Sequence, residues 1–198
     1  SWKKAGIFLT HVGLIVLLLG QLLTEVFQVE SRVRLDLGET AWYSLTQDEN
    51  ELVFVSRLDD AQDQVISIPE SMLMPGREIS HPELPFKLAV KKFWLNADIW
   101  KPGQGEKPSK AEPTQTTAGA GRDQYIVPLP KAIKEDEANL PAAVVTISGT
   151  QSSDGDWLVW SGTETTQEIQ HGEGNATTKY QMSLRWKRFY RPYSLTLL

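Results

Sequence analysis

The sequence of 198 residues contains no cysteine. Without cysteine the chain has no disulfide bond and offers no thiolate metal site, CxxC redox pair or covalent haem attachment. The sequence also contains none of the GxSxG, HExxH, Walker A or GxGxxG patterns that mark common catalytic and nucleotide-binding sites. We therefore do not expect an enzyme that acts on its own.

Positive charge is scarce. Lysine and arginine number 20 against 25 aspartates and glutamates, which gives a net charge of −5. The body from residue 28 onward is mildly acidic and has no basic run that would neutralise the phosphates of a nucleic acid. This charge distribution argues against a nucleic-acid partner.

Long apolar runs are absent except at the N-terminus. From Ala5 to Thr24, twenty consecutive residues carry no formal charge when His11 is neutral. About 20 apolar residues cross the roughly 30 Å hydrocarbon core of a bilayer, and a helix satisfies their backbone hydrogen bonds there. We predict that residues 1–28 form a transmembrane helix in the lipid bilayer.

A cleaved signal peptide is the alternative, but the apolar run is too long and Leu22–Glu25 makes a poor cleavage site. Lys3 and Lys4 precede the run, which predicts a cytoplasmic N-terminus and an extracytoplasmic body. The chain opens with Ser1 rather than methionine and ends within the apolar run Thr196–Leu198. We therefore expect a fragment of a longer protein.

Two features of the predicted helix concern function. Small residues fall close to one face and favour packing against another helix, although glycine is also frequent in membrane helices by chance. These residues are Gly6, Thr10, Gly13, Gly20 and Thr24. His11 lies away from that face, inside the apolar run. A histidine at such depth either hydrogen-bonds a carbonyl or headgroup near the interface, or ligates a metal such as haem iron.

Beyond the helix the apolar pattern changes to a period of two. Val29–Leu37 alternates apolar and polar residues, which predicts a half-buried strand ended by Gly38 and Glu39. Further strands are expected at Glu51–Leu58, Gln64–Ile68, Phe86–Trp94, Gln124–Leu129, Ala142–Ser148, Asp156–Ser161 and Lys179–Phe189. Residues 29–198 thus predict an extracytoplasmic, mainly antiparallel β domain, sandwich-like or barrel-like, and truncated at its C-terminus. Pro130–Leu140 is the best, weak candidate for a helix in it.

Two segments are poor in apolar residues. Lys101–Arg122 includes four glycines and three prolines, and its only apolar side chains are alanines. Such a segment buries too little surface to offset its ordering entropy, so we predict a mobile insertion over residues 101–122. Gln167–Thr178 has a similar composition on a smaller scale.

Candidate metal ligands outside the helix are weak. His81 and His171 have no second histidine nearby in the sequence, and we interpret both as solvated loop residues. Asp59, Asp60 and Asp63 form an acidic patch that does not match an EF-hand loop.

Aromatic and basic residues give two further candidates. Trp157 and Trp160 fall on opposite faces of a strand, so one is expected in the core and the other exposed or interfacial. Packing of a tryptophan on a planar ligand is the alternative. Basic side chains on strands suit haem propionates or lipid phosphates, but solvent-facing positions are the favoured interpretation. They are Lys91, Lys92, Arg185, Lys187, Arg188 and Arg191.

Phe8–Leu14, followed by Leu17–Gly20, resembles the helix that enters the extracytoplasmic domain of ResB-like (CcsB-type) cytochrome c biogenesis proteins. Val29–Leu37 with Gly38-Glu39 and the closing stretch Arg188–Leu198 are similar to the same family. The resemblance is best over residues 6–40 and 188–198, and the middle is similar only in its β-rich pattern.

The resemblance implies a subunit of the system II cytochrome c biogenesis complex in the bacterial inner (cytoplasmic) membrane. With a CcsA-type haem-handling membrane protein, such a complex carries haem b across the membrane and presents it for covalent attachment to apocytochrome c. By the same resemblance, His11 corresponds to an axial haem ligand shared with a histidine of that partner. The alternative is a membrane-anchored β domain with a structural or assembly role and no cofactor.

Overall fold

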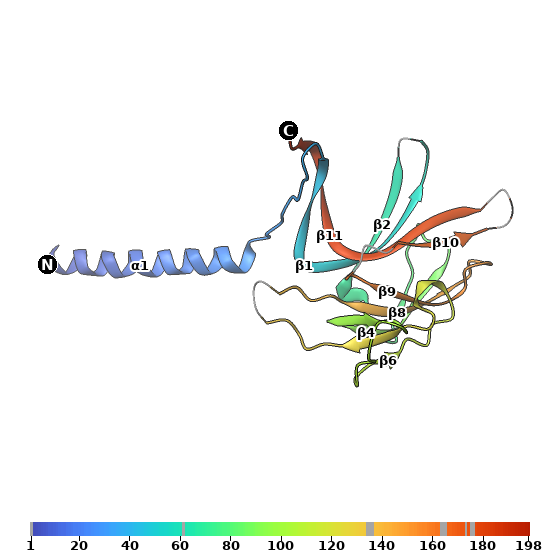
Figure 1. Ribbon diagram of the computed structural model, residues 1–198. Helices are drawn as coiled ribbons and strands as arrows, with labels where there is room; N and C mark the ends of the chain where they lie inside the picture. The colour runs from blue at the N-terminus through green and yellow to red at the C-terminus, as the bar shows by residue number, and fades with distance from the viewer. Residues whose placement is uncertain (1, 61, 134–136, 163–165, 173, 175–176) are drawn as a thin grey trace. The chain divides into compact units, whose positions relative to one another are not determined.

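The computed structural model of the chain describes residues 2–60, 62–133, 137–162, 166–172, 174 and 177–198. The chain divides into two compact units, Ser1–Arg32 and Val33–Leu198. The first unit is one long helix, and the second consists mainly of antiparallel strands (Figure 1). The predicted order of a long apolar helix and a β domain is confirmed.

Helix α1 (Trp2–Phe27) makes up most of the first unit. Its segment Lys4–Phe27, of 24 residues, is long and apolar enough to cross a bilayer. None of the most apolar part of this segment is buried against the described chain. The helix therefore has the length and composition that the sequence predicted, and its insertion in a membrane stays a prediction.

The prediction of a strand at Val29–Leu37 is wrong. Residues 28–39 belong to no strand and contain a single isolated bridge position at Arg32. Apart from the half-buried Ser31 and Leu35, they are exposed, so the alternating apolar residues have no core to enter. The ladder between β1 and β11 begins at Thr40, so residues 29–37 lie outside it.

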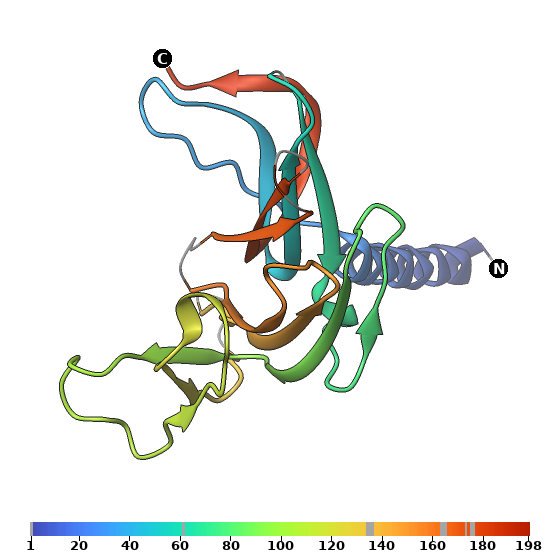
Figure 2. The ribbon, with the colours of Figure 1, turned by 90° about the vertical axis from the view of Figure 1, so that its right-hand side faces the viewer.

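The β domain contains two four-stranded antiparallel sheets, which Figures 1 and 2 show from two sides. The first sheet has the order β10-β11-β1-β2, with bounds Gln167–His171, Thr178–Thr196, Thr40–Arg57 and Asp63–Pro69. The second has the order β3-β4-β8-β9, with bounds Glu78–Ile79, Lys87–Trp94, Ala142–Ser148 and Gly155–Trp160. A short 3-10 helix, η1 (Glu70–Met72), follows β2.

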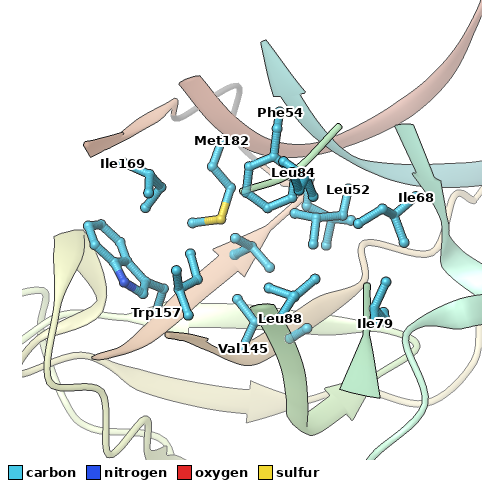
Figure 3. Packing of buried hydrophobic residues seen from close by; sticks show 14 of the residues in the cluster. Leu52, Phe54, Ile68, Ile79, Leu84, Leu88, Val145, Trp157, Ile169 and Met182 are labelled. Atoms are coloured by element: carbon cyan, nitrogen blue, oxygen red, sulfur yellow. The ribbon is translucent and has the colours of Figure 1, made fainter. Parts of the chain in front are cut away.

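The main core lies between these two sheets. Figure 3 shows Leu52, Phe54 and Met182 of the first sheet near Leu88 and Val145 of the second. All five side chains are almost completely buried. The domain is therefore a sandwich, which is one of the two architectures that the sequence left open.

A third, smaller sheet covers the other face of the second sheet. Its order is β5-β7-β6, with bounds Ala97–Trp100, Tyr125–Pro128 and Glu112–Pro113. Ile126 of this sheet packs with Val144 and Leu158 in a second apolar cluster. Because β8 is covered on both faces, the adjacent residues Val144 and Val145 are both buried. Such a doubly covered strand loses the alternation of apolar and polar residues.

Most predicted strands in the domain are present, with different ends. β1 and β11 are much longer than the predicted Glu51–Leu58 and Lys179–Phe189. β10 lies inside Gln167–Thr178, the segment whose composition is similar to that of the predicted mobile insertion. The remainder of that segment includes positions 173, 175 and 176, which lie outside the described residues. The described residues of Pro130–Leu140 form no helix, and residues 134–136 are also outside the description.

The predicted insertion 101–122 is exposed over its first part but packed at its end. Thr114, Ala118 and Gly121 are buried, and a short 3-10 helix, η2, covers Gly119–Gly121. A Cβ atom at Gly119 would lie 2.4 Å from the ring of Trp157, and its φ of +69° also favours glycine. These glycines therefore permit close packing on β9, and the mobility of the remaining segment stays a prediction.

β1 and β11 pair along nearly their full lengths, but not in one register. From Leu45 to Asn50, β1 advances five residues while β11 advances two, since Leu45 faces Arg188 and Asn50 faces Trp186. Nearer the outer end of the ladder, which is the end at Thr40 and Thr196, the opposite shift occurs. Between the pairs Tyr43↔Tyr190 and Ala41↔Leu195, β11 advances five residues while β1 advances two. The two bulges cancel, so the register at the outer end equals that in the core.

One carboxylate organises the connection between β8 and β9. Thr150 donates from its backbone N and from its hydroxyl to Asp154 Oδ1, at 2.7 and 2.6 Å. The backbone N of Gly149 donates to Asp154 Oδ2 at 3.0 Å. These hydrogen bonds, the Thr150 hydroxyl foremost, hold the pKa of Asp154 below its ordinary value of 3.8.

We expect Asp154→Asn to lower the free energy of unfolding by about 1 kcal/mol at pH 7, a modest amount because the carboxylate is solvent-exposed. Since folding lowers this pKa, the stabilisation is complete above pH 3.8 and is lost as the pH falls through the folded-state pKa. Urea unfolding of the full chain in detergent at several pH values measures the difference. Asp36→Asn is the control for net charge. The prediction is contradicted if the difference in unfolding free energy between Asp154→Asn and wild type does not shrink below pH 3.8.

Candidate functional site

His11 lies on the exposed surface of α1, and its ring is held by the helix itself. Its Nδ1 lies 2.7 Å from the backbone oxygen of Ile7, one turn earlier. Because a carbonyl oxygen only accepts hydrogen bonds, Nδ1 is the donor, and in the neutral ring Nε2 carries the lone pair. A metal-ligating histidine commonly donates its other ring N–H in this way.

The small-residue face of α1 is uncovered within the described chain. A Cβ atom at Gly6, Gly13 or Gly20 would meet nothing within 4 Å. The hydroxyls of Thr10 and Thr24 donate to backbone oxygens one turn earlier, each at 2.9 Å. The face therefore presents a smooth surface whose hydroxyls are already satisfied, which permits close approach of another helix.

His11 offers one nitrogen to a metal ion, and the haem iron implied by the resemblance stays a prediction. His11 can offer one nitrogen, and among the described residues no group of three or more His, Cys, Asp or Glu side chains is placed to hold a metal ion. The side chains of Ile7, Leu14 and Ile15 close to it on the helix are apolar and exposed. A macrocycle against this surface would thus meet apolar side chains and a single protein nitrogen from this chain.

The two remaining histidines lie in the β domain and are not brought together. His81 is in a loop, where its Nδ1 accepts a hydrogen bond from the backbone N of Glu83 at 3.3 Å. His171 ends β10, pairs with Gln151 and has its ring 6.4 Å from that of Phe86. The loop interpretation holds for His81 and is wrong for His171, whose strand the polar, glycine-rich sequence did not reveal.

Trp157 and Trp160 face opposite ways from β9, as predicted. Trp157 is only 7% exposed and belongs to the main core, with its Nε1 donating to the backbone oxygen of Ser153 at 3.1 Å. Trp160 packs against the second apolar cluster and donates from Nε1 to the backbone oxygen of Ala97 at 2.9 Å. Both rings are accounted for by packing within the domain.

The acidic patch is a turn. Asp63 pairs with Arg57 at 3.3 Å, and Asp59 accepts a hydrogen bond from the backbone N of Gln62 at 2.8 Å. These interactions close the connection between β1 and β2, in agreement with the interpretation as a surface feature.

Several of the basic candidates are paired within the domain. Lys91 lies 2.7 Å from Asp156 and Lys187 lies 2.5 Å from Glu49, both with substantial exposure to solvent. Arg185 differs, because its side chain is 14% exposed and its Nε donates to Glu51 Oε1 at 3.0 Å. The solvent-facing interpretation is therefore wrong for Arg185.

Glu51 is the buried carboxylate that sequence reasoning missed. Its side chain is 5% exposed, and besides Arg185 it accepts from the hydroxyl of Ser67 at 2.5 Å. It is separated from Arg185 by 134 residues, so no local pattern relates the two. Their pairing depends on the register of β1 against β11.

No known family model, curated protein or solved structure matches this chain. The resemblance over residues 6–40 and 188–198 and everything that it implies therefore stay predictions.

We expect Glu51→Gln to lower the free energy of unfolding by about 2–3 kcal/mol, because it leaves the guanidinium of Arg185 largely buried without its charge partner. Asp63→Asn is the matched control, since it removes the acid from the exposed Arg57 pair and is expected to cost less than about 1 kcal/mol. Urea unfolding of the full chain, followed by tryptophan fluorescence, measures both. Equal losses for the two variants would show that burial does not distinguish these pairs.

Proposed function

We propose that this chain is a haem-handling subunit of a system II cytochrome c biogenesis complex, anchored in the bacterial inner membrane by α1. Haem b is its cargo, and His11 provides one axial ligand. A CcsA-type partner supplies the second ligand, and the β domain lies outside the cytoplasm where apocytochrome c receives the haem. This chain alone is a ligand donor and carries out no covalent step.

The observation that carries the proposal is the state of the His11 ring. In a neutral ring, the hydrogen bond from Nδ1 to Ile7 O leaves the lone pair on Nε2. The side chains next to it on the helix, Ile7, Leu14 and Ile15, are apolar and exposed. Because Nδ1 already donates to a carbonyl oxygen, His11 can bind iron through Nε2 without a change in its existing hydrogen bond.

The exposed helix supports the assembly with a membrane partner. An apolar helix whose small-residue face is uncovered has a surface on which a neighbouring helix can pack closely. His11 lies away from that face, so packing there leaves its ring accessible to cargo and to a second ligand.

The ends of the β domain also suit a subunit of this kind. The backbone N of Gly38 donates to Leu197 O at 2.8 Å, and Thr40 pairs with Thr196. The first residue of β1 and the last residue of β11 thus lie at the same end of the first sheet. Such a domain can be carried between membrane segments without disturbing its core.

The anchored β domain without cofactor is the competing function. It is favoured by the burial of Trp157 in the main core and by the packing of the partly buried Trp160 against the second apolar cluster. In this case the hydrogen bond from His11 to Ile7 only satisfies a polar group within an apolar helix.

The test is the visible absorption spectrum of the chain, purified in detergent with a CcsA-type partner after co-expression. We expect the reduced b-type band to be lost or strongly weakened in His11→Ala, because one axial ligand is removed, and to return with added imidazole. His81→Ala is the matched control, since it removes a histidine from a loop of the β domain and should leave the band unchanged. An unchanged band in His11→Ala would contradict the ligand assignment and favour the cofactor-free domain.

A further inference from the structure

A cavity of about 230 Å³ lies at one end of the β domain. Part of its wall comes from the first sheet, where the bulge of β1 faces β11, and includes Leu45 and Arg188. Another part comes from the ends of the second sheet, with Leu140 just before β8 and Ser161 just after β9. The cavity is therefore lined from both sheets and adjoins the main core at Leu184.

Three residues of this wall have a buried polar atom that lacks a hydrogen-bond partner within the described chain. The atoms are Ser161 Oγ, Trp186 Nε1 and Arg188 Nε. Buried polar groups are rarely left unpaired, and three around one cavity call for an external partner. The indole and guanidinium N–H groups only donate, and the hydroxyl also can, so the missing partner is an acceptor.

The charge of the wall favours an anion. The guanidinium of Arg185 is compensated by Glu51 at 3.0 Å. Arg188 lies 4.2 Å from the centre of the Tyr43 ring and pairs with no carboxylate among the described side chains. Among the described side chains, one positive charge therefore remains without a carboxylate partner beside the unpaired donors. A planar carboxylate matches the geometry of a guanidinium well.

The rest of the wall is apolar. Leu45, Leu140 and Leu184 line the cavity, which is smaller than the roughly 300–1,000 Å³ typical of sites for drug-sized ligands. We propose that this cavity binds a carboxylate carried on a small apolar body, with the carboxylate at Ser161, Trp186 and Arg188 and the body against the leucines. The site lies wholly in the β domain, and it does not depend on haem or on His11.

The experiment follows the indole N–H resonance of Trp186 in the full chain, labelled with ¹⁵N-tryptophan and held in an uncharged detergent. Trp186→Phe assigns the resonance. We expect 3-phenylpropanoate to shift it saturably, because the carboxylate accepts from Nε1, while 3-phenylpropanamide and inorganic phosphate leave it nearly unmoved.

Two variants test the role of the cavity wall in binding, and a third variant is the control. Arg188→Gln and Ser161→Ala should weaken binding, the first by at least about tenfold because a charged hydrogen bond is lost. Lys187→Gln removes the same charge one residue away, at a side chain that pairs with Glu49 outside the cavity wall, and should change affinity less than about twofold. Ser161→Ala changes few atoms and keeps the test valid if Arg188→Gln does not fold.

The source of the carboxylate is identified by a second ligand, N-acetyl-Ala-Ala-Phe with a free C-terminus. Tighter binding than 3-phenylpropanoate indicates a polypeptide terminus, and equal or weaker binding indicates a small acid; both support the site. The proposal is overturned if Trp186 does not respond to either carboxylate, if the amide produces the same shift, or if Lys187→Gln weakens binding as much as Arg188→Gln. Because haem takes no part in any arm, this result is separable from the His11 experiment.

Discussion

The pairing of β1 with β11 is the constraint on which the rest of the β domain depends. These strands are the two longest, they occupy the centre of the first sheet, and they are joined only after most of the domain has intervened. Their inner segment places Leu52 opposite Leu184 and Phe54 opposite Met182, which forms one side of the core. Because such long-range pairing must form before the sandwich can close, we expect it to govern cooperative folding of the domain.

The two bulges in this ladder separate an inner part of the first sheet, which packs in the core, from an outer part, which lines the cavity. On the side of Asn50 that leads to Thr40, the two strands leave the main core. There the bulge of β1 places Trp186 and Arg188 in the wall of a cavity. At the inner side of the same bulge, Glu51 and Arg185 form a largely buried ion pair. Several buried polar residues of the domain, including Ser44, Asn50 and Glu51, thus lie at or beside the bulge of β1, and bulges often change the direction of side chains.

The sequence predicted the features that depend on local pattern. The apolar length of α1, the opposite directions of Trp157 and Trp160, and the existence of β2, β4, β7, β8 and β9 follow from periodicity and turn residues. It failed where tertiary contacts decide. Alternation at Val29–Leu37 has no sheet to join, β10 forms from a polar segment because β11 supplies its partner, and Glu51 meets Arg185 across 134 residues. For the candidate site, the sequence identified His11, but only the structure shows which ring nitrogen hydrogen-bonds to the helix and which does not.

The bulged register is tested most directly by cross-linking, since the chain has no cysteine of its own. The structure predicts that a chain carrying Leu45→Cys and Arg188→Cys forms a disulfide under mild oxidation, because these positions face each other across the ladder. A ladder that kept the register of Asn50↔Trp186 would instead place Leu45 opposite Arg191. Efficient cross-linking of the Leu45→Cys and Arg191→Cys pair, with none for the first pair, would contradict the bulge and with it the origin of the cavity.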